Sequence, residues 1–271
     1  MRALPIVIFS IWITPAIMTV CHAETPAELA SHGTETLARD IWAVVSAPAR
    51  LRKDHLPVLL TAAGAAFIPA IIDRPCNDAI GGTTSRDLDK VYDAVEPFGQ
   101  VRAAYIAGGI VLTGGLATGS KRAVRAGAEC VEAGLITVTL TSLLKNATGR
   151  SRPGETSDPF IFHPFDRGNS WPSNHATQSF ATAAVFSSYT PWWGDALLFA
   201  GASTVSGFDL YDNRHWASDI AGGAVLGWAT GRAMVRLHDR RKNNIPERCS
   251  ITLSTVGTSI NGTGLFITAR F

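Results

Sequence analysis

The sequence predicts an all-α fold, a multi-helix bundle, followed by a small C-terminal β-hairpin. Two observations predict the bundle: uncharged segments rich in Ala, Leu and Gly recur along the chain, and shorter polar stretches separate them. The hairpin is predicted by the change after Pro246, where runs of strand-forming residues flank an Asn-Gly pair. A chain of 271 residues can bury a sizeable core as one domain with appendages.

Residues 1–23 are expected to be a signal peptide. Arg2 is followed by the largely apolar run Ala3–Val20, and the small residues Cys21 and Ala23 fit cleavage after Ala23. An uncleaved first transmembrane helix is the alternative. Export would permit a disulfide, but the sequence does not choose a pair, and Cys130 is expected to stay free in an apolar helix. The cysteines left after cleavage would be Cys76, Cys130 and Cys249.

Residues 24–54 are expected to form an N-terminal amphipathic segment. Within it, a helix over Thr36–Leu51 would place Leu37, Ile41 and Val44 on roughly one side. Such a helix would pack against the bundle or lie on a membrane surface.

The bundle itself is expected over residues 55–240. The polar stretches Asn77–Asp93 and Gly154–Asn169 predict loops. A membrane-spanning helix needs about 20 mostly apolar residues, and only Leu56–Ile72 and Ala103–Ser120 approach that length. The mean hydropathy of +0.14 is modest for a multi-spanning protein, so a membrane bundle and a soluble bundle both remain open. The expected helices are Leu56–Ile72, Ala103–Ser120, Ala133–Leu144, Ala176–Gly194, Ala196–Phe208 and Ile220–Gly231.

The tail, residues 247–271, differs from the bundle. Ile251–Ile260 and Thr263–Phe271 are rich in strand-forming residues and flank Asn261-Gly262, which favours a tight hairpin turn. One hairpin cannot close a barrel, so the tail is interpreted as a small appendage.

Three short blocks carry the residue types that bind and attack a phosphate. The first has Lys145 and, after six residues, Arg152 followed by proline. The second is Pro172–His175, with the sequence Pro-Ser-Asn-His, and the third has His215 with Asp219 four positions later. Two cations, a hydroxyl, two imidazoles and a carboxylate together favour a phosphohistidine mechanism.

In order and spacing, these blocks resemble the type 2 phosphatidic acid phosphatase superfamily, which also contains bacterial class A acid phosphatases and vanadium haloperoxidases. The resemblance covers roughly residues 56–237 and implies a helical bundle with phosphatase activity that needs no metal or cofactor. The sequence departs from the superfamily pattern at two places. Asn174 stands where glycine is usual, and Phe208 and Asp209 stand where a Ser-Arg pair is usual.

The resemblance also implies a role for each site residue. His215 would form the phosphohistidine, and Asp219, one helical turn later, would fix the tautomer of its imidazole. His175 would protonate the leaving group and later activate water. Pro153 is expected to end the preceding helix, so that Arg152 projects from a helix end. The residues expected to bind the phosphate are Lys145, Arg152, Ser173 and Asn174.

Asp209 leaves several interpretations open. A carboxylate that faces a bound phosphate would repel it. Alternatively, Asp209 forms an ion pair with a cation of the pocket, or the chain turns it away, or Arg150 or Arg214 compensates for the missing arginine. Without any of these, the protein would be a slow phosphatase or a relative that only binds phosphate.

The leading hypothesis is a metal-independent phosphatase that hydrolyses a lipid-linked phosphate monoester or pyrophosphate on the periplasmic side of the bacterial inner membrane. The alternatives are a soluble periplasmic acid phosphatase for small monoesters and a non-catalytic relative that binds phosphate headgroups. A haloperoxidase ranks last because such chains are usually much longer. The expected partners are a phosphorylated lipid or small phosphate ester and a membrane. With a net charge of +2 and no basic face, nucleic acid is not an expected partner, and the oligomeric state is open.

Overall fold

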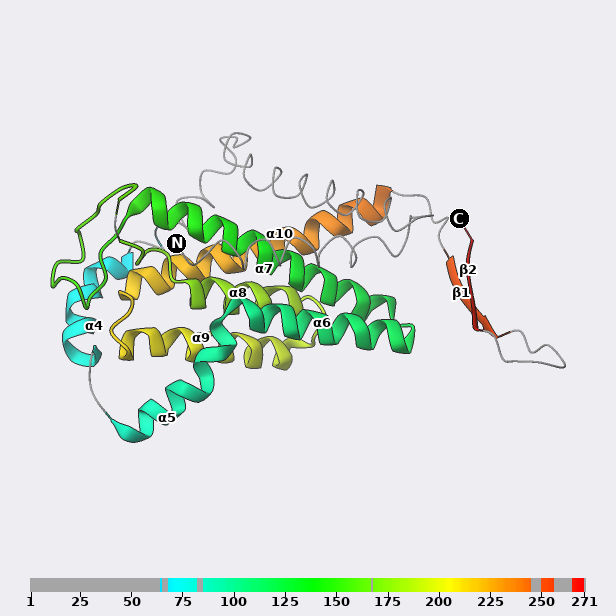
Figure 1. Cartoon of the computed structure of the whole chain (residues 1–271), viewed down its shortest axis with the longest axis horizontal. Helices are drawn as coiled ribbons and strands as arrows, with labels where there is room; N and C mark the ends of the chain where they lie inside the picture. Colours follow the sequence, from blue (N-terminus) through cyan, green and yellow to red (C-terminus); the bar gives the residue numbers. More distant parts are fainter. Residues whose placement is uncertain are drawn as a thin grey trace.

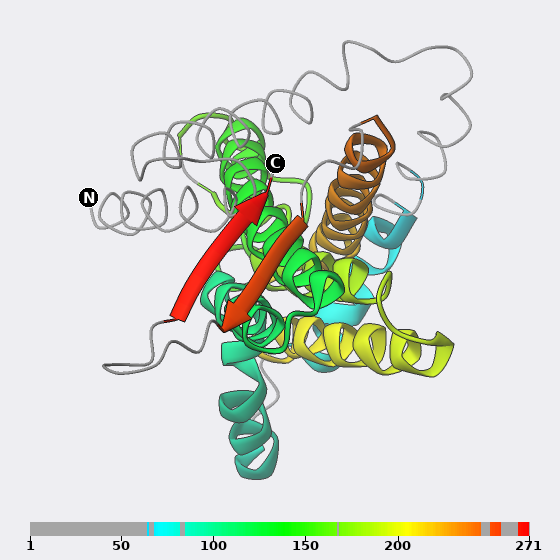
Figure 2. The same cartoon turned by 90° about the vertical axis from the view of Figure 1, so that its right-hand side faces the viewer.

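The structure is a computed structural model that describes residues 64, 68–81, 85–166, 168–244, 250–255 and 265–270. Within them, long helices run alternately up and down a bundle, with their axes roughly along its length (Figure 1). Viewed end-on, α6 and α7 occupy one side of this bundle and α9 and α10 the other (Figure 2). The long helices are α6 (Val101–Thr118), α7 (Lys121–Thr148), α8 (Asn174–Phe186), α9 (Trp192–Tyr211) and α10 (Ala217–Asn244).

One end of the bundle gathers the parts of the chain that carry the three sequence blocks. α7 and α9 end there, α8 and α10 begin there, and the loop between α7 and α8 covers it (Figure 1). Shorter elements complete this end of the bundle. They are η3 (Ile68–Ile72), α4 (Asp73–Ile80), α5 (Arg86–Val95) and η4 (Glu96–Gly99).

Local signals explain where α7 begins and ends. The Ser120 hydroxyl caps its N-terminus by accepting a hydrogen bond from the Ala123 amide at 3.3 Å. Gly149 then adopts a left-handed conformation, with φ of 57°, and ends the helix. The prediction that Pro153 ends this helix is therefore wrong, and Arg152 lies in the following loop rather than at a helix end.

Several predicted boundaries also need correction. Residues expected to form one loop, Asn77–Asp93, include the end of α4 and most of α5. The expected helix Ala176–Gly194 is divided by a turn, and Pro191 caps the second part. α7 begins well before Ala133, and α10 continues well past Gly231.

The extensions of α7 and α10 contain charged residues that are paired inside the bundle. The side chain of Glu129 accepts a hydrogen bond from Nε of Arg125 at 2.7 Å and another from the Tyr189 hydroxyl at 2.8 Å. His238 on α10 lies between two buried acids of α7, with Nδ1 3.2 Å from Glu129 and Nε2 3.0 Å from Glu132. Paired charges of this kind are tolerated in an interior, so the helices continue through them.

Small residues let the helices pack closely around α8 and α7. A Cβ atom on Gly227 of α10 would lie 2.2 Å from the carbonyl oxygen of Thr177 on α8. A Cβ atom on Gly127 of α7 would lie 2.4 Å from the backbone nitrogen of Leu112 on α6. The backbones at both places are therefore too close for any larger residue.

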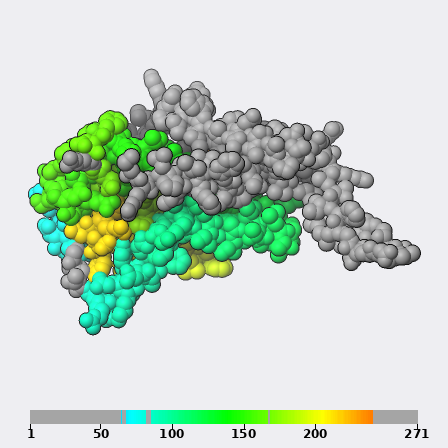
Figure 3. All heavy atoms as spheres, viewed as in Figure 1, coloured from blue at the N-terminus to red at the C-terminus, as the bar shows by residue number. Residues whose placement is uncertain are grey.

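Two of the described helices, α6 and α7, are long and apolar enough to cross a membrane. Most of the apolar window of α7 is buried, whereas α6 lies on the outside and exposes Ile106 and Ile110, the latter to 66%. The space-filling view shows α6 as a long band on the surface, with α5 projecting from the bundle below it (Figure 3). Buried helices of soluble proteins can pass the same test of length and composition. The exposed helix α6 is therefore stronger evidence for a membrane than the buried helix α7.

The tail contains the antiparallel pair β1 (Ser250–Thr255) and β2 (Leu265–Arg270), with Ser250 opposite Arg270. The Asn261-Gly262 turn, the signal peptide, the helix over Thr36–Leu51, most of Leu56–Ile72, and Cys249 lie outside the described residues. The cysteines that the structure describes, Cys76 and Cys130, are both free, and Cys130 is buried as well.

Candidate active site

The site end of the bundle brings the key residues of the three blocks together. Ser173 caps α8 and His175 lies in its first turn, while Asp219 lies in the first turn of α10. Lys145 is in the last turn of α7, and Arg152 follows in the loop that covers this end. The tertiary fold therefore joins groups that the sequence separates by up to 74 positions, from Lys145 to Asp219.

His215 and Asp219 form the first imidazole–carboxylate pair. Nδ1 of His215 lies 3.5 Å from Oδ2 of Asp219, and the two residues are 5% and 0% exposed. Catalytic hydrogen bonds are often this long without substrate. Burial lowers the pKa of His215 below its ordinary value, outweighing the opposing effect of Asp219 and Asp209. The imidazole is therefore neutral near pH 7, with Nε2 as the nitrogen that does not face Asp219.

Asp219 is held in place by several donors. Nη1 of Arg150 donates to Oδ1 at 2.6 Å, the backbone amide of Trp216 donates to Oδ2 at 2.9 Å, and the hydroxyl of Ser170 also donates to Oδ2. Burial alone would raise the pKa of Asp219, but its contacts with His215 and the charge of Arg150 lower it. The carboxylate is thus ionised and fixed in orientation.

Arg150 does not replace the missing phosphate-binding arginine. It is 3% exposed, and Nη2 donates to Asp73 on α4 at 2.7 Å while Nη1 reaches Ser218 and Asp219 at 2.6 Å each. Nε donates to the Pro159 carbonyl at 2.9 Å. All three guanidinium nitrogens have protein partners. Arg150 therefore holds Asp73 and Asp219 in place and does not face a bound phosphate.

His175 and Asp209 form a second imidazole–carboxylate pair, which the sequence did not predict in this form. Nδ1 of His175 lies 2.8 Å from Oδ1 of Asp209, and the Ser173 hydroxyl donates to Oδ2 at 2.7 Å. On the other side of the ring, Oε1 of Glu96 lies 3.5 Å from Nε2. Of the interpretations left open for Asp209, the structure agrees with pairing to another group of the site, and the partner is a histidine.

The charge of His175 differs from that of His215. Burial alone would lower the pKa of His175, but the hydrogen bond and charge of Asp209, with a smaller effect of Glu96, outweigh burial and raise it. Conversely, burial alone would raise the pKa of Asp209, but the hydrogen bond to His175 and smaller effects of the neighbouring side chains lower it. Two imidazoles at one site are therefore biased toward opposite protonation states.

Lys145 and Arg152 are joined through Asn169. Nζ of Lys145 donates to the carbonyl oxygens of Asn169 and Ser170, the latter at 3.3 Å, and Nε of Arg152 donates to Oδ1 of Asn169 at 2.8 Å. Both cations thus contact one loop position beside the two imidazole pairs. Asn174, the remaining predicted phosphate ligand, is the exposed first residue of α8.

Some supporting residues were missed by sequence reasoning. Asp73 gave only one signal, an acid directly after the apolar residues Ile71 and Ile72. Ser170 and Glu96 gave none, because their partners are distant in the sequence. No group of three or more His, Cys, Asp or Glu residues arranged to hold a metal occurs in the part of the chain that the structure describes.

Comparison with known proteins agrees with the resemblance seen in the sequence. Residues 128–243 match the family model described as the PAP2 superfamily. The matched region begins within α7, ends in α10, and contains all three sequence blocks.

A curated relative and two crystal structures are also similar. The lipid A 1-phosphatase of Porphyromonas gingivalis is 35% identical over an alignment of 95 residues, which covers 32% of this chain and 18% of that protein. The first transmembrane PAP2 type phosphatidylglycerolphosphate phosphatase from Bacillus subtilis has a TM-score of 0.50, with 17% identity over 68% of this chain and 96% of that one. LpxE of Aquifex aeolicus has a TM-score of 0.45, with 17% identity over 62% of this chain and 94% of that one. At such identity, the structural likeness concerns the fold alone.

Proposed function

We propose that this PAP2 protein is a metal-independent phosphatase that hydrolyses a lipid-linked phosphate monoester or pyrophosphate on the periplasmic side of the membrane. The observation that carries the proposal is a pair of imidazoles at one end of the bundle, each beside its own buried carboxylate, with pKa values shifted in opposite directions. A neutral imidazole can attack phosphorus, and a protonated one can supply the proton that the leaving oxygen needs. Lys145 and Arg152 supply positive charge at the same end of the bundle.

The first step forms a phosphohistidine. Nε2 of His215 attacks phosphorus in line with the leaving oxygen, so that a P–N bond forms as the P–O ester bond breaks. His175 donates its proton to that oxygen, and the alcohol leaves neutral. Asp219 stabilises the cationic ring of His215, because its carboxylate faces Nδ1.

In the second step, water removes the phosphoryl group from His215. Neutral His175 takes a proton from the water, whose oxygen bonds to phosphorus while the P–N bond breaks. Inorganic phosphate leaves, and both imidazoles return to their starting states. Lys145 and Arg152 neutralise charge on the oxygens that do not react, and Arg152 can contact two of them with its planar guanidinium group.

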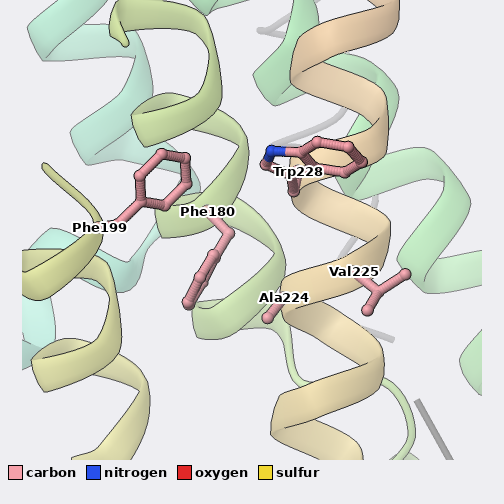
Figure 4. Close-up of a pocket in the computed structure, with 5 residues that line it drawn as sticks. All are labelled: Phe180, Phe199, Ala224, Val225 and Trp228. Atoms are coloured by element: carbon pink, nitrogen blue, oxygen red, sulfur yellow. The ribbon is translucent and has the colours of Figure 1, made fainter. Parts of the chain in front are cut away.

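A lipid-linked substrate is supported by an apolar pocket on the helices that carry the site. Figure 4 shows Phe180 of α8 between Phe199 of α9 and the α10 residues Ala224 and Trp228, around a space of about 460 Å³. Phe180 is five residues beyond His175, which places it roughly 8 Å from that residue along the helix. We infer that a hydrocarbon chain attached to a phosphate at the site extends toward this pocket. Two of the similar proteins are named as phosphatases of lipid A and of phosphatidylglycerol phosphate, and these names agree with a lipid-linked substrate.

The test is phosphate release by the purified protein in the presence of a chelator. Phosphatidate, a prenyl pyrophosphate and an aryl phosphate would be compared, because they separate lipid from soluble substrates. His215→Ala should abolish turnover, and rapid quenching of the unaltered protein with labelled substrate should trap an acid-labile phosphoenzyme.

His163→Ala is the matched control, because His163 is an exposed histidine of the loop near the site. It should keep the activity of the unaltered protein. Turnover that survives in His215→Ala, or that stops with chelator, would contradict the proposed mechanism. Faster turnover of the aryl phosphate than of either lipid would favour a soluble acid phosphatase.

A further inference from the structure

Asp209 lies near the end of α9, where the superfamily pattern usually has a phosphate-binding arginine. Its carboxylate is 1% exposed and both oxygens are engaged, Oδ1 at 2.8 Å from Nδ1 of His175 and Oδ2 at 2.7 Å from the Ser173 hydroxyl. We propose that Asp209 is a positioning residue, which orients His175 and keeps it protonated for transfer to the leaving oxygen. This inference rests on the proposed function and deepens it.

The contacts hold the imidazole in one orientation. With Asp209 at Nδ1, the nitrogen that remains for proton transfer is Nε2, on the opposite side of the ring. Ser173 binds the second oxygen of Asp209 and also caps α8, the helix that carries His175, by accepting from the Ala176 amide at 3.3 Å. Carboxylate, hydroxyl and imidazole thus form a connected set between α8 and α9. A buried acid that fixes a histidine in this way also fixes its tautomer.

The charges around His175 favour its protonated form. Asp209 approaches from α9 and Glu96 from η4, and both raise its pKa against the effect of burial. Arg214, in the turn after α9, acts in the opposite direction but more weakly. His215 precedes α10 and is biased toward the neutral form, so it adds little positive charge beside the ring.

An arginine at position 209 would reverse this balance. It would place a cation where the carboxylate now lies, and the protonated form of His175 would be disfavoured. With a carboxylate at position 209, the site lacks one cation that would bind the phosphate. Lys145 and Arg152 remain for that role. We therefore expect Asp209 to affect the chemical step, measured by kcat, more than substrate binding.

Asp209→Asn tests this expectation because asparagine keeps the shape and an oxygen acceptor for Nδ1 but removes the charge. For an alkyl phosphate, kcat should fall by about a hundredfold, at the low end of what a general acid contributes. For p-nitrophenyl phosphate the fall should be much smaller, because its leaving oxygen needs little protonation. KM should change little for either substrate.

The pH profile gives a second readout. Activity needs His175 protonated, so it is lost as the pH rises through the raised pKa of that residue. In Asp209→Asn, burial of the ring persists without the compensating charge, and the alkaline limb of kcat should move to lower pH. A purely structural defect would lower activity equally at every pH and for both leaving groups.

Two further variants make the comparison specific. Asp195→Asn removes a carboxylate from the first turn of the same helix, away from the site, and should leave both readouts unchanged. Asp209→Arg introduces the residue usual in the superfamily. It should lower kcat for the alkyl phosphate at least as much as Asp209→Asn does, because a cation disfavours protonated His175 more than a neutral amide does.

Equal losses on both substrates in Asp209→Asn, or an unmoved alkaline limb, would overturn the inference while leaving the phosphohistidine mechanism intact. Turnover that does not need His215 would instead contradict the proposed function. An NMR titration of the ¹⁵N-labelled His175 ring needs no turnover. His175 should titrate at lower pH in Asp209→Asn, and an unchanged titration would also overturn the inference.

Discussion

Arg150 and Arg152 are two positions apart but have opposite environments. Arg150 is buried and bonded to Asp73 and Asp219, whereas Arg152 is partly exposed and bonds the side chain of Asn169. The sequence shows both as basic residues after an apolar helix, and only the superfamily spacing distinguishes Arg152. The burial of Arg150 depends on α4 and α10, which lie far away in sequence.

Arg150→Ala should destabilise the fold strongly. It would leave Asp73 and Asp219 buried without their cation, a change that typically costs about 3–5 kcal/mol. Thermal and denaturant unfolding, followed by circular dichroism, would measure the loss. Arg152→Ala should cost much less, because that guanidinium group is partly exposed. Equal stability of the two variants would contradict the structural role assigned to Arg150.

The role of Asp209 could be predicted only in part from the sequence. The sequence revealed the departure from the superfamily pattern and listed an ion pair among its explanations. It could not choose His175 as the partner, since the two lie 34 positions apart and meet only where α8 begins and α9 ends. The structure supplies this partner, because Nδ1 of His175 lies 2.8 Å from Oδ1 of Asp209.

At the level of elements, apolar periodicity located helices but not all of their boundaries. α7 and α10 extend through Glu129, Glu132 and His238, whose charges are paired with one another inside the bundle. A pattern of apolar residues cannot show such pairing. α5 was missed because it is a largely polar helix on the outside of the bundle, where the sequence resembles a loop.

The apolar pocket is lined by α8, α9 and α10, with Phe180 of α8 between Phe199 and the α10 residues (Figure 4). Ala224→Trp should fill this pocket and obstruct a hydrocarbon chain. KM for a long-chain phosphate should rise by at least about tenfold, because each methylene kept from an apolar site loses about 0.8 kcal/mol. KM for p-nitrophenyl phosphate should stay the same, and steady-state kinetics on both substrates would show the difference.

Ile106→Trp supplies the matching control, since it adds the same side chain to an exposed position of α6 outside the pocket. It should change neither KM. A parallel rise in KM for both substrates in Ala224→Trp would mean that the pocket does not bind the chain.

For the whole molecule, the sequence predicted the all-α bundle and the resemblance to the PAP2 superfamily, and both are confirmed. The three blocks could be expected to meet because each lies at the end or beginning of an apolar helix. The choice between membrane and soluble bundles could not be made from composition, because close packing of small residues suits both.

The exposed apolar face of α6 favours a membrane-embedded protein. We expect the protein to stay with the membrane pellet through an alkaline carbonate wash and to be released by detergent. Recovery in a detergent-free supernatant would contradict this and would favour the soluble periplasmic alternative. Immunoblotting of both fractions is the measurement.

His238 also fixes how α10 is aligned along α7. Its two ring nitrogens contact Glu129 and Glu132 at 3.2 and 3.0 Å, so a slide of one residue, about 1.5 Å along the axis, would break both contacts. At the opposite ends of these helices lie Lys145 and Asp219, roughly 20–30 Å away along the axes. The contacts of His238 at the far end of the bundle therefore help to set the spacing between Lys145 and Asp219 at the site.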